Sequence, residues 1–264
     1  MNNFSENPIG IFDSGIGGTS IWKEINKLLP NENTLFLSDS KNAPYGQKSK
    51  EKIIELSIKN TEYLLRNNCK IIVIACNTAT TNAITYLREN YKVPFIGIEP
   101  AIKPASLKTK TNTIGILATK GTLNSRLFEK TSSLINSNIK IIEQVGEGLV
   151  ELIENGKINS MEMDLLLNKH LKPMIENNVD CLVLGCTHYP YLIKKIKEIT
   201  NSKINIIDSG EAVSLQVKNI LQKNNLENTS NLEGKHTFLI NKNKSVLEYF
   251  LTNYKDAVVK ESDF

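Results

Sequence analysis

The sequence lacks the basic patches that mark most nucleic-acid-binding proteins. Only three of its 32 basic residues are arginine, and aromatic residues make up 6% of the chain. Nucleic-acid-binding domains usually combine clustered arginine with interleaved aromatic side chains. We therefore expect no nucleic-acid partner. The basic residues, mostly lysine, outnumber the acidic residues and give a formal net charge of +4, which we interpret as a solvated surface that also suits an anionic substrate.

Long apolar runs are also missing. The longest, residues 71–76, is far shorter than the ~20 apolar residues that span a bilayer, so we expect no membrane association. Residues 1–8 are polar and acidic, unlike a secretory leader, which predicts a cytoplasmic protein with reduced thiols. The four cysteines form no Cys-x-x-Cys motif, which argues against a structural zinc site or a dithiol redox site.

The pattern that is present alternates short apolar runs with longer segments of helical period. A chain of 264 residues suggests roughly two domains. Alternating strands and helices without hairpin signals predict parallel sheets covered by helices on both faces, an α/β fold. One such helix is expected over about residues 49–68. The expected strands are Ile9–Phe12, Thr34–Leu37, Ile71–Ala75, Phe95–Ile98, Thr113–Leu117, Lys140–Ile142, Cys181–Leu184 and Lys203–Ile207.

The two halves of the chain resemble each other. Gly10–Gly15 matches Gly115–Lys120 in pattern, and Asn67–Cys76 aligns without a gap to Asn177–Cys186. This internal repeat predicts two α/β domains of similar topology. We expect one domain to comprise residues 1–98 with 212–264, the other to comprise residues 99–211, and the tail from Leu215 onward to pack as extra helices.

The repeat places Cys76 and Cys186 at equivalent points, each directly after a buried strand. Ligands of open α/β sheets bind at the carboxyl ends of the strands, so two facing domains would bring the two thiols to one cleft. A cysteine at a helix N-terminus has a lowered pKa, which favours the thiolate. A thiolate and a thiol on opposite sides of a carbon atom can invert a stereocentre without a cofactor. Either cysteine alone could equally be a core residue.

Two polar turns follow other predicted strands. The loop from Asp13 to Ser20 opens a helix, so its backbone N–H groups are expected to bind a carboxylate. The loop has neither the third glycine of a dinucleotide-binding motif nor the lysine of a P-loop. Asp13 is either a helix cap or a proton acceptor beside a thiol. The turn at residues 42–46 is expected to line the cleft.

These segments together resemble the bacterial glutamate racemase family, which supplies D-glutamate for peptidoglycan without a cofactor. The matching stretches are GIFDSGIGG at 10–18, PYG at 44–46, CNTA at 76–79, GILATKGT at 115–122, GCTHYP at 185–190 and Asp208–Ser209. The resemblance implies two Rossmann-like domains related by a pseudo-two-fold axis, with the active site in the cleft between them. It also implies that L- and D-glutamate are the substrates, and it leaves a homodimer open.

The resemblance further implies a role for each matched residue. Cys76 would exchange the Cα proton on the D-glutamate side and Cys186 on the L-glutamate side, assisted by Asp13 and His188. Glu154 is assigned as a further catalytic group near Cys186, with Glu151 occupying the family's proline position. The implied substrate-binding residues are Asp13, Ser14, Tyr45, Gly46, Asn77, Thr78, Thr187 and His188.

Several alternatives stay open at the level of the sequence. His188 could be a capping or core histidine, or the base of a cysteine hydrolase. The substrate could be aspartate, a hydantoin or another small acid, and the chain could be a two-domain binding protein with structural cysteines. Zinc held by Cys76, Cys186 and His188 would lack a fourth ligand. His170 and His236 are expected to be ordinary surface residues.

Overall fold

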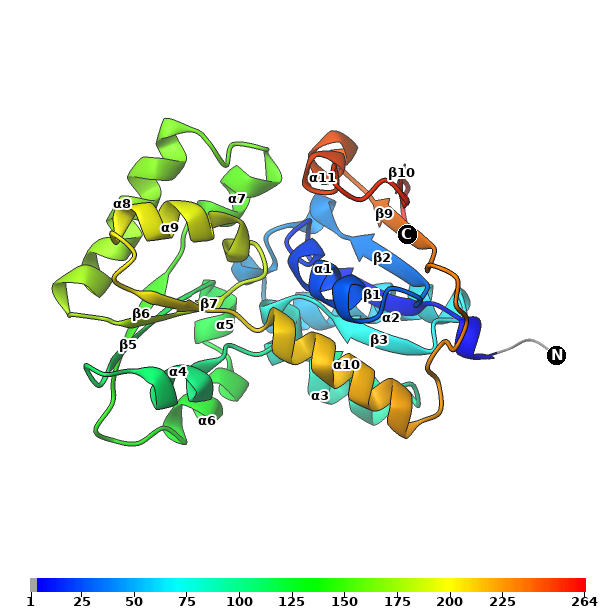
Figure 1. The fold of residues 1–264 in the computed structure, drawn as a ribbon, viewed down its shortest axis with the longest axis horizontal. Helices are drawn as coiled ribbons and strands as arrows, with labels where there is room; N and C mark the ends of the chain where they lie inside the picture. The colour runs from blue at the N-terminus through cyan, green and yellow to red at the C-terminus, as the bar shows by residue number, and fades with distance from the viewer. Residues whose placement is uncertain (1–3) are drawn as a thin grey trace.

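A computed structural model describes residues 4–264 as two α/β units that lie side by side (Figure 1). Each unit is built on its own sheet, and all strand pairs in both sheets are parallel. Helices cover both faces of the sheets (Figure 1). The predicted α/β class with two parallel sheets is confirmed.

The first sheet carries the strands of the N-terminal third of the chain and two strands of the C-terminal tail. They are β1 (Ile9–Asp13), β2 (Thr34–Ser38), β3 (Ile71–Ile74), β4 (Phe95–Gly97), β9 (His236–Ile240) and β10 (Ala257–Glu261). Their order across the sheet is β10-β9-β2-β1-β3-β4. The tail therefore does not consist only of extra helices, as the sequence had suggested, because β9 pairs with β2 and extends the sheet.

The second sheet repeats the central part of the first. Its strands are β5 (Thr113–Ala118), β6 (Lys140–Val145), β7 (Cys181–Gly185) and β8 (Asn205–Ile207). The order β6-β5-β7-β8 corresponds to β2-β1-β3-β4, since in both sheets the first strand of the repeat lies between the second and the third. The internal repeat seen in the sequence is thus a repeat of topology.

Helices connect successive strands and cover the sheets. The α-helices are α1 (Thr19–Leu28), α2 (Lys50–Arg66), α3 (Asn77–Asn90), α4 (Ile102–Lys108), α5 (Lys120–Leu123), α6 (Arg126–Ser133), α7 (Leu149–Glu154), α8 (Met161–Glu176), α9 (Ile193–Ile199), α10 (Gly210–Lys223) and α11 (Lys244–Phe250). The 3₁₀ helices are η1 (Phe4–Glu6), η2 (Ser40–Asn42), η3 (Tyr45–Gln47) and η4 (Tyr189–Leu192). Among these described residues, no helix is both long and apolar enough to cross a bilayer.

Alternation along the strands divides the core between the two faces of each sheet. In β1, Ile9 and Ile11 pack on the side of α1 and α10, whereas Phe12 packs on the side of α2 and α3. In the same way, β7 directs Leu182 toward α8 and α9 and Val183 toward α4. Because successive strand residues point to opposite faces, a strand covered on both sides must be apolar throughout.

Two histidines expected at the surface are buried. His170 on α8 is 3% exposed, and its ring nitrogens lie 3.1 Å from Gln144 Nε2 and 2.9 Å from the carbonyl oxygen of Glu147. His236 on β9 is 7% exposed, with Nδ1 3.0 Å from Thr34 Oγ1. Their polar partners come from distant segments, which satisfies the buried rings and explains why local composition was misleading.

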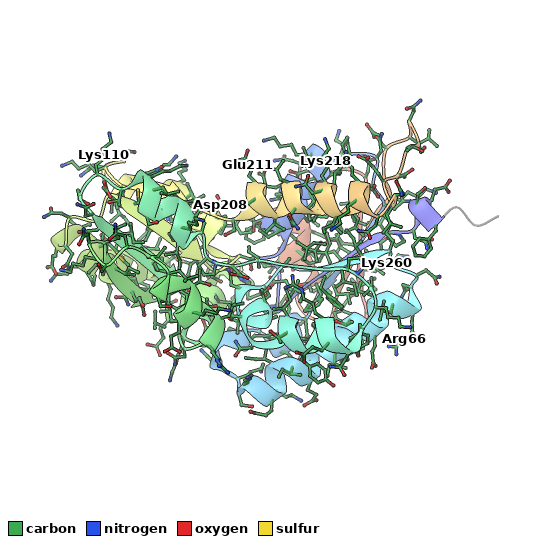
Figure 2. The ribbon with its side chains drawn as sticks, turned by 90° about the horizontal axis from the view of Figure 1, so that it is seen from below. Arg66, Lys110, Asp208, Glu211, Lys218 and Lys260 are labelled. Carbon is green, nitrogen blue, oxygen red and sulfur yellow. The ribbon has the colours of Figure 1, made fainter. Side chains whose placement is uncertain are left out.

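The chain passes between the two units twice, once after β4 and once after β8. Figure 2 shows Asp208 at this junction, just before α10, along which Glu211 and Lys218 follow. Ser209 Oγ donates to the carbonyl oxygen of Glu99 at 2.6 Å, so the two connecting segments are joined to each other. We propose that this junction marks the domain boundary, with residues 1–98 and 212–264 on one side and residues 99–211 on the other.

Candidate active site

The carboxyl ends of both sheets meet at one small cavity. Cys76 follows β3 and Cys186 follows β7, the equivalent strand of the second sheet. Both cysteines are buried, and both line the cavity. The space open to a water-sized sphere is about 10 Å³, about enough for one water molecule. The cavity is lined by Ser14, Pro44, Tyr45, Gly46, Cys76, Asn77, Thr78, Thr119, Val150, Cys186, Thr187 and His188.

Cys76 caps the N-terminus of α3. Its Sγ accepts from the N–H of Ala79 at 3.4 Å, and its thiol contacts Ser14 Oγ at 3.5 Å. Burial nevertheless raises the pKa of the Cys76 thiol well above its ordinary value, and the charge of Asp13 raises it further, against the opposing effect of the hydrogen bonds with Ser14 and Ala79. The expected lowering of this pKa by the helix N-terminus is therefore wrong for this closed cavity, because desolvation outweighs the dipole.

Asp13 is the last residue of β1 and lies behind Cys76. Its carboxylate is fully buried and accepts from the N–H of Gly18 at 2.6 Å and from Thr187 Oγ1 at 3.4 Å. Burial raises the pKa of Asp13 to about 6, although the charge of His188 and the Gly18 N–H act in the opposite direction. Asp13 can therefore change its protonation state near neutral pH.

Cys186 is associated with a histidine and a glutamate. Its Sγ lies 3.7 Å from Nδ1 of His188, and Nε2 of the same ring lies 2.6 Å from Glu154 Oε1. Burial alone would lower the pKa of His188, but the hydrogen bonds and charges of Cys186 and Glu154 raise it well above its ordinary value. Only the 3₁₀ helix η4 follows directly, and α9 begins at Ile193, so the predicted helix N-terminus is not at Cys186.

Glu154 and Glu151 lie on the same short helix, α7, but have different surroundings. Glu154 is 7% exposed and contacts His188, whereas Glu151 Oε1 accepts from Gln47 Nε2 at 2.6 Å near the surface. Of the two carboxylates, Glu154 is therefore the one that contacts His188, whose ring in turn contacts Cys186.

The glycine loop between β1 and α1 contacts side chains of the protein with its N–H groups. Ile16 N–H donates to Glu154 Oε1 at 2.7 Å, Gly17 N–H lies 3.3 Å from His188 Nε2, and Gly18 N–H donates to Asp13. The expectation that these groups bind a substrate carboxylate is therefore wrong for residues 16–18. Ile16 and Gly17 connect the first unit to Glu154 and His188 of the second, whereas Gly18 binds Asp13 within the first unit.

The predicted substrate-binding residues other than Asp13 all line the cavity. Asn77 is the most informative of them, because it is 2% exposed and neither atom of its side-chain amide has a hydrogen-bond partner among the described residues. A buried polar group without a partner is costly, so this amide is poised to bind a polar ligand in the cavity. The Tyr45 hydroxyl, in contrast, donates to Asp39 Oδ2 at 2.6 Å.

Sequence reasoning missed three residues that hydrogen-bond to Glu154 or Tyr45, directly or through one another. Ser40 lies just beyond the carboxyl end of β2 and donates to Glu154 Oε2 at 2.7 Å. Asp39 accepts from the Tyr45 hydroxyl and from Nδ2 of Asn241. Asn241 lies in the tail, directly after β9. The signal for Ser40 and Asp39 was their place at the end of a parallel strand. No local signal connected Asn241 to the site, since β9 was not predicted.

In the described part of the chain, no group of three or more His, Cys, Asp and Glu side chains has an arrangement that could hold a metal ion.

Comparison with known proteins gives a consistent result. Residues 9–216 match the family model described as Asp/Glu/Hydantoin racemase. The chain is 45% identical over 214 residues to a glutamate racemase of Ralstonia pickettii, covering 81% of this chain and 76% of the relative. The solved structure of a glutamate racemase isoform from Bacillus anthracis matches with a TM-score of 0.87 and 30% identity, covering 98% of both chains. A glutamate racemase from Francisella tularensis, solved in complex with D-glutamate, matches with a TM-score of 0.84, 30% identity and the same coverage.

Proposed function

Because the chain belongs to the Asp/Glu/Hydantoin racemase family, we propose that it interconverts L- and D-glutamate by proton transfer at Cα between two thiols. The family match confirms the resemblance found in the motifs and makes the protein an isomerase. The observation that supports the two-thiol mechanism most directly is that Cys76 and Cys186 follow equivalent strands and line one cavity.

Glutamate is favoured as the substrate by the relatives. Glutamate racemases match the chain in both sequence and structure, and the one from Francisella tularensis was solved with D-glutamate. The unpartnered amide of Asn77 and the hydroxyls of Ser14 and Thr78 can bind carboxylate and ammonium groups in the same cavity. Supply of D-glutamate for peptidoglycan, a cytoplasmic location and a homodimer belong to the same proposal.

The reaction needs one thiolate and one thiol at the start. The thiolate removes the Cα proton and becomes a thiol, and the opposite thiol delivers its proton to the other face of the carbanion. We assign Cys76 to the D-glutamate side and Cys186 to the L-glutamate side, with Asp13 assisting Cys76 and the His188–Glu154 pair assisting Cys186. The resulting state is the mirror of the first, so each thiol serves as acid in one direction and base in the other.

Burial of the site affects the protonation of Cys76 differently without and with a bound substrate. It holds Cys76 in the neutral form without ligand, but a substrate ammonium group beside the sulfur would favour the thiolate. The same dry environment strengthens the hydrogen bonds to the α-carboxylate as the carbanion forms. The cavity is far too small for glutamate, so the two units must open for substrate to enter.

The cysteines themselves provide the first test. Cys76→Ala and Cys186→Ala should each lower the rate of racemisation by about a thousandfold or more, because each removes the only acid–base group on one face of Cα. The assay is circular dichroism of L-glutamate without added pyridoxal phosphate, nucleotide or metal.

The other two cysteines provide matched controls. Cys69 and Cys181 are also buried, but neither lines the cavity. Cys69→Ala and Cys181→Ala should therefore keep the rate within about twofold of the wild type, since core changes of this kind act mainly on stability. Full activity of either cavity variant would reject the assignment.

The same assays distinguish the alternative functions. Inversion of aspartate but not of glutamate would change the proposed substrate, and a stable acyl-enzyme adduct detected by intact mass would indicate a hydrolase.

A further inference from the structure

The carboxylate of Glu154 belongs to the second unit but is held by the first. Oε1 accepts from the backbone N–H of Ile16 at 2.7 Å, and Oε2 accepts from the hydroxyl of Ser40 at 2.7 Å. Ile16 lies in the loop after β1, and Ser40 lies just after β2. Both oxygens of this buried carboxylate are therefore fixed by groups that reach across the cleft.

Ser40 is itself oriented by a second serine. Ser40 is 5% exposed, and its Oγ lies 3.1 Å from Oγ of Ser38, the last residue of β2. Because Ser40 donates its proton to Glu154, Ser38 must donate to Ser40. This gives a chain of hydrogen bonds in one direction, Ser38 to Ser40 to Glu154, in which each bond polarises the next.

The Glu154 carboxylate determines which nitrogen of His188 holds its proton and which nitrogen can exchange a proton with the thiol of Cys186. Glu154 accepts from two other donors, so the 2.6 Å contact with Nε2 requires that Nε2 carries a proton and donates it. A protonated Nε2 cannot accept, so the Gly17 N–H at 3.3 Å from the same nitrogen makes a contact but no hydrogen bond. Nδ1, 3.7 Å from Cys186 Sγ, is left to exchange a proton with the thiol.

We propose that Ser40 is a positioning residue for the acid–base group of the opposite unit: it fixes Glu154, which fixes the proton on Nε2 of His188 and presents Nδ1 to Cys186. The inference rests on the proposed racemase function and extends it. Since Ser40 and Ile16 belong to the first unit, the assistance to Cys186 is complete only when the two units are closed. Cys186 is thus fully assisted by His188 and Glu154 only after the two units have closed on a ligand.

A double-mutant cycle separates this role from a general effect on packing. Ser40→Ala should lower kcat for glutamate about tenfold with KM within about twofold, because it removes one hydrogen bond to a buried charged group. Ser40→Thr, which keeps the hydroxyl, should restore most of the activity. In the Glu154→Gln background, Ser40→Ala should change kcat by less than about twofold, since residues that act through one another are not additive.

The imidazole of His188 gives a readout that needs no substrate. The chain has three histidines, so the His188 resonances can be assigned by replacing His170 and His236 in turn. The groups that face the ring are Cys186, Glu154 and, by its charge, Asp13. Ser40→Ala should move the NMR titration midpoint of His188 toward lower pH by about half a unit or more, because the carboxylate is no longer held against the imidazolium. In Glu154→Gln the same substitution should leave the midpoint unchanged.

Ser57→Ala is the matched control. Ser57 is fully buried in α2, and its hydroxyl donates to the carbonyl oxygen of Ile53, away from the cavity. Equal losses of kcat from Ser40→Ala with and without the Glu154 carboxylate, or an unmoved His188 midpoint, would overturn the positioning role. Failure of the wild type to invert glutamate would instead reject the proposed function, while the NMR titration would still report whether Ser40 orders the His188–Glu154 pair.

Discussion

At the scale of single residues, the site combines buried titratable groups with few compensating charges. Burial raises the pKa of Cys76 well above its ordinary value and that of Asp13 to about 6, whereas the pKa of His188 is raised because Cys186 and Glu154 outweigh burial. The amide of Asn77 has no partner among the described residues. These features cost stability in the closed protein and are relieved by a ligand that carries charge and hydrogen-bonding groups.

Asp13 makes this cost measurable through the pH dependence of stability. Its pKa is raised in the folded state, from 3.8 to about 6, so folding favours the protonated form. The stabilising contribution of Asp13 to the free energy of unfolding is fully present below its pKa in the unfolded state. This contribution is lost as pH rises through its pKa in the folded state. A shift of about two units corresponds to roughly 3 kcal/mol in the free energy of unfolding.

Asp13→Asn should remove that loss. Relative to the wild type, the variant should gain up to roughly 3 kcal/mol as pH increases from about 4 to 7, measured by urea unfolding at a series of pH values. Glu89→Gln, at an exposed carboxylate on α3, is the control for the loss of a surface carboxylate. A difference between Asp13→Asn and wild type that does not vary with pH would show that Asp13 does not titrate in this range.

At the scale of secondary-structure elements, the loop between β1 and α1 is the main link from the first unit to the second. A Cβ atom on Gly17 would lie 2.2 Å from Nδ1 of His188, and one on Gly15 would lie 2.0 Å from Oε1 of Glu154. Neither glycine has a positive φ. Close approach to the opposite unit, not backbone conformation, therefore requires glycine at both positions.

Gly17→Ala should separate folding from activity. The new methyl group collides with His188 only when the units are closed, so kcat/KM for glutamate should fall by about a hundredfold or more while each unit stays folded. Gly210→Ala is the control, because its Cβ would meet only side-chain atoms at 3.1 Å or more. The measurement is the racemase assay together with a thermal unfolding curve; wild-type activity of Gly17→Ala would show that this loop need not dock on His188.

Element prediction succeeded where a segment's own sequence determines its structure. The runs expected at residues 9–12 and 181–184 became β1 and β7, because strands buried on both faces are apolar throughout. The helix expected over about residues 49–68 is α2, Lys50–Arg66, with Ser49 as its N-cap. The strand β9 was missed because its place in the sheet depends on pairing with β2, about 200 residues away, which no local pattern encodes. The strand β10 was missed with it, since β10 joins the sheet by pairing with β9.

At the scale of the whole molecule, the repeat explains how one sequence can place two equivalent cysteines around one cavity. Both thiols follow the third strand of the same topological unit, and the units face each other at their carboxyl ends. This arrangement was predictable from the aligned segments that end in Cys76 and Cys186. The contacts that complete it, Ser40 and Ile16 to Glu154, cross between units and depend on how the units dock, which the sequence does not specify locally.

The claim that the two thiols act on opposite faces of one carbon is tested most directly by isotope incorporation. L-glutamate is incubated with the wild-type protein in D₂O, the reaction is stopped at about 10% conversion, and the enantiomers are separated and analysed by mass spectrometry. The two-thiol account predicts that the D-glutamate formed carries deuterium at Cα while the recovered L-glutamate keeps its original proton. Deuterium appearing equally in the recovered substrate and in the product would show that a single base serves both faces, and it would contradict the account.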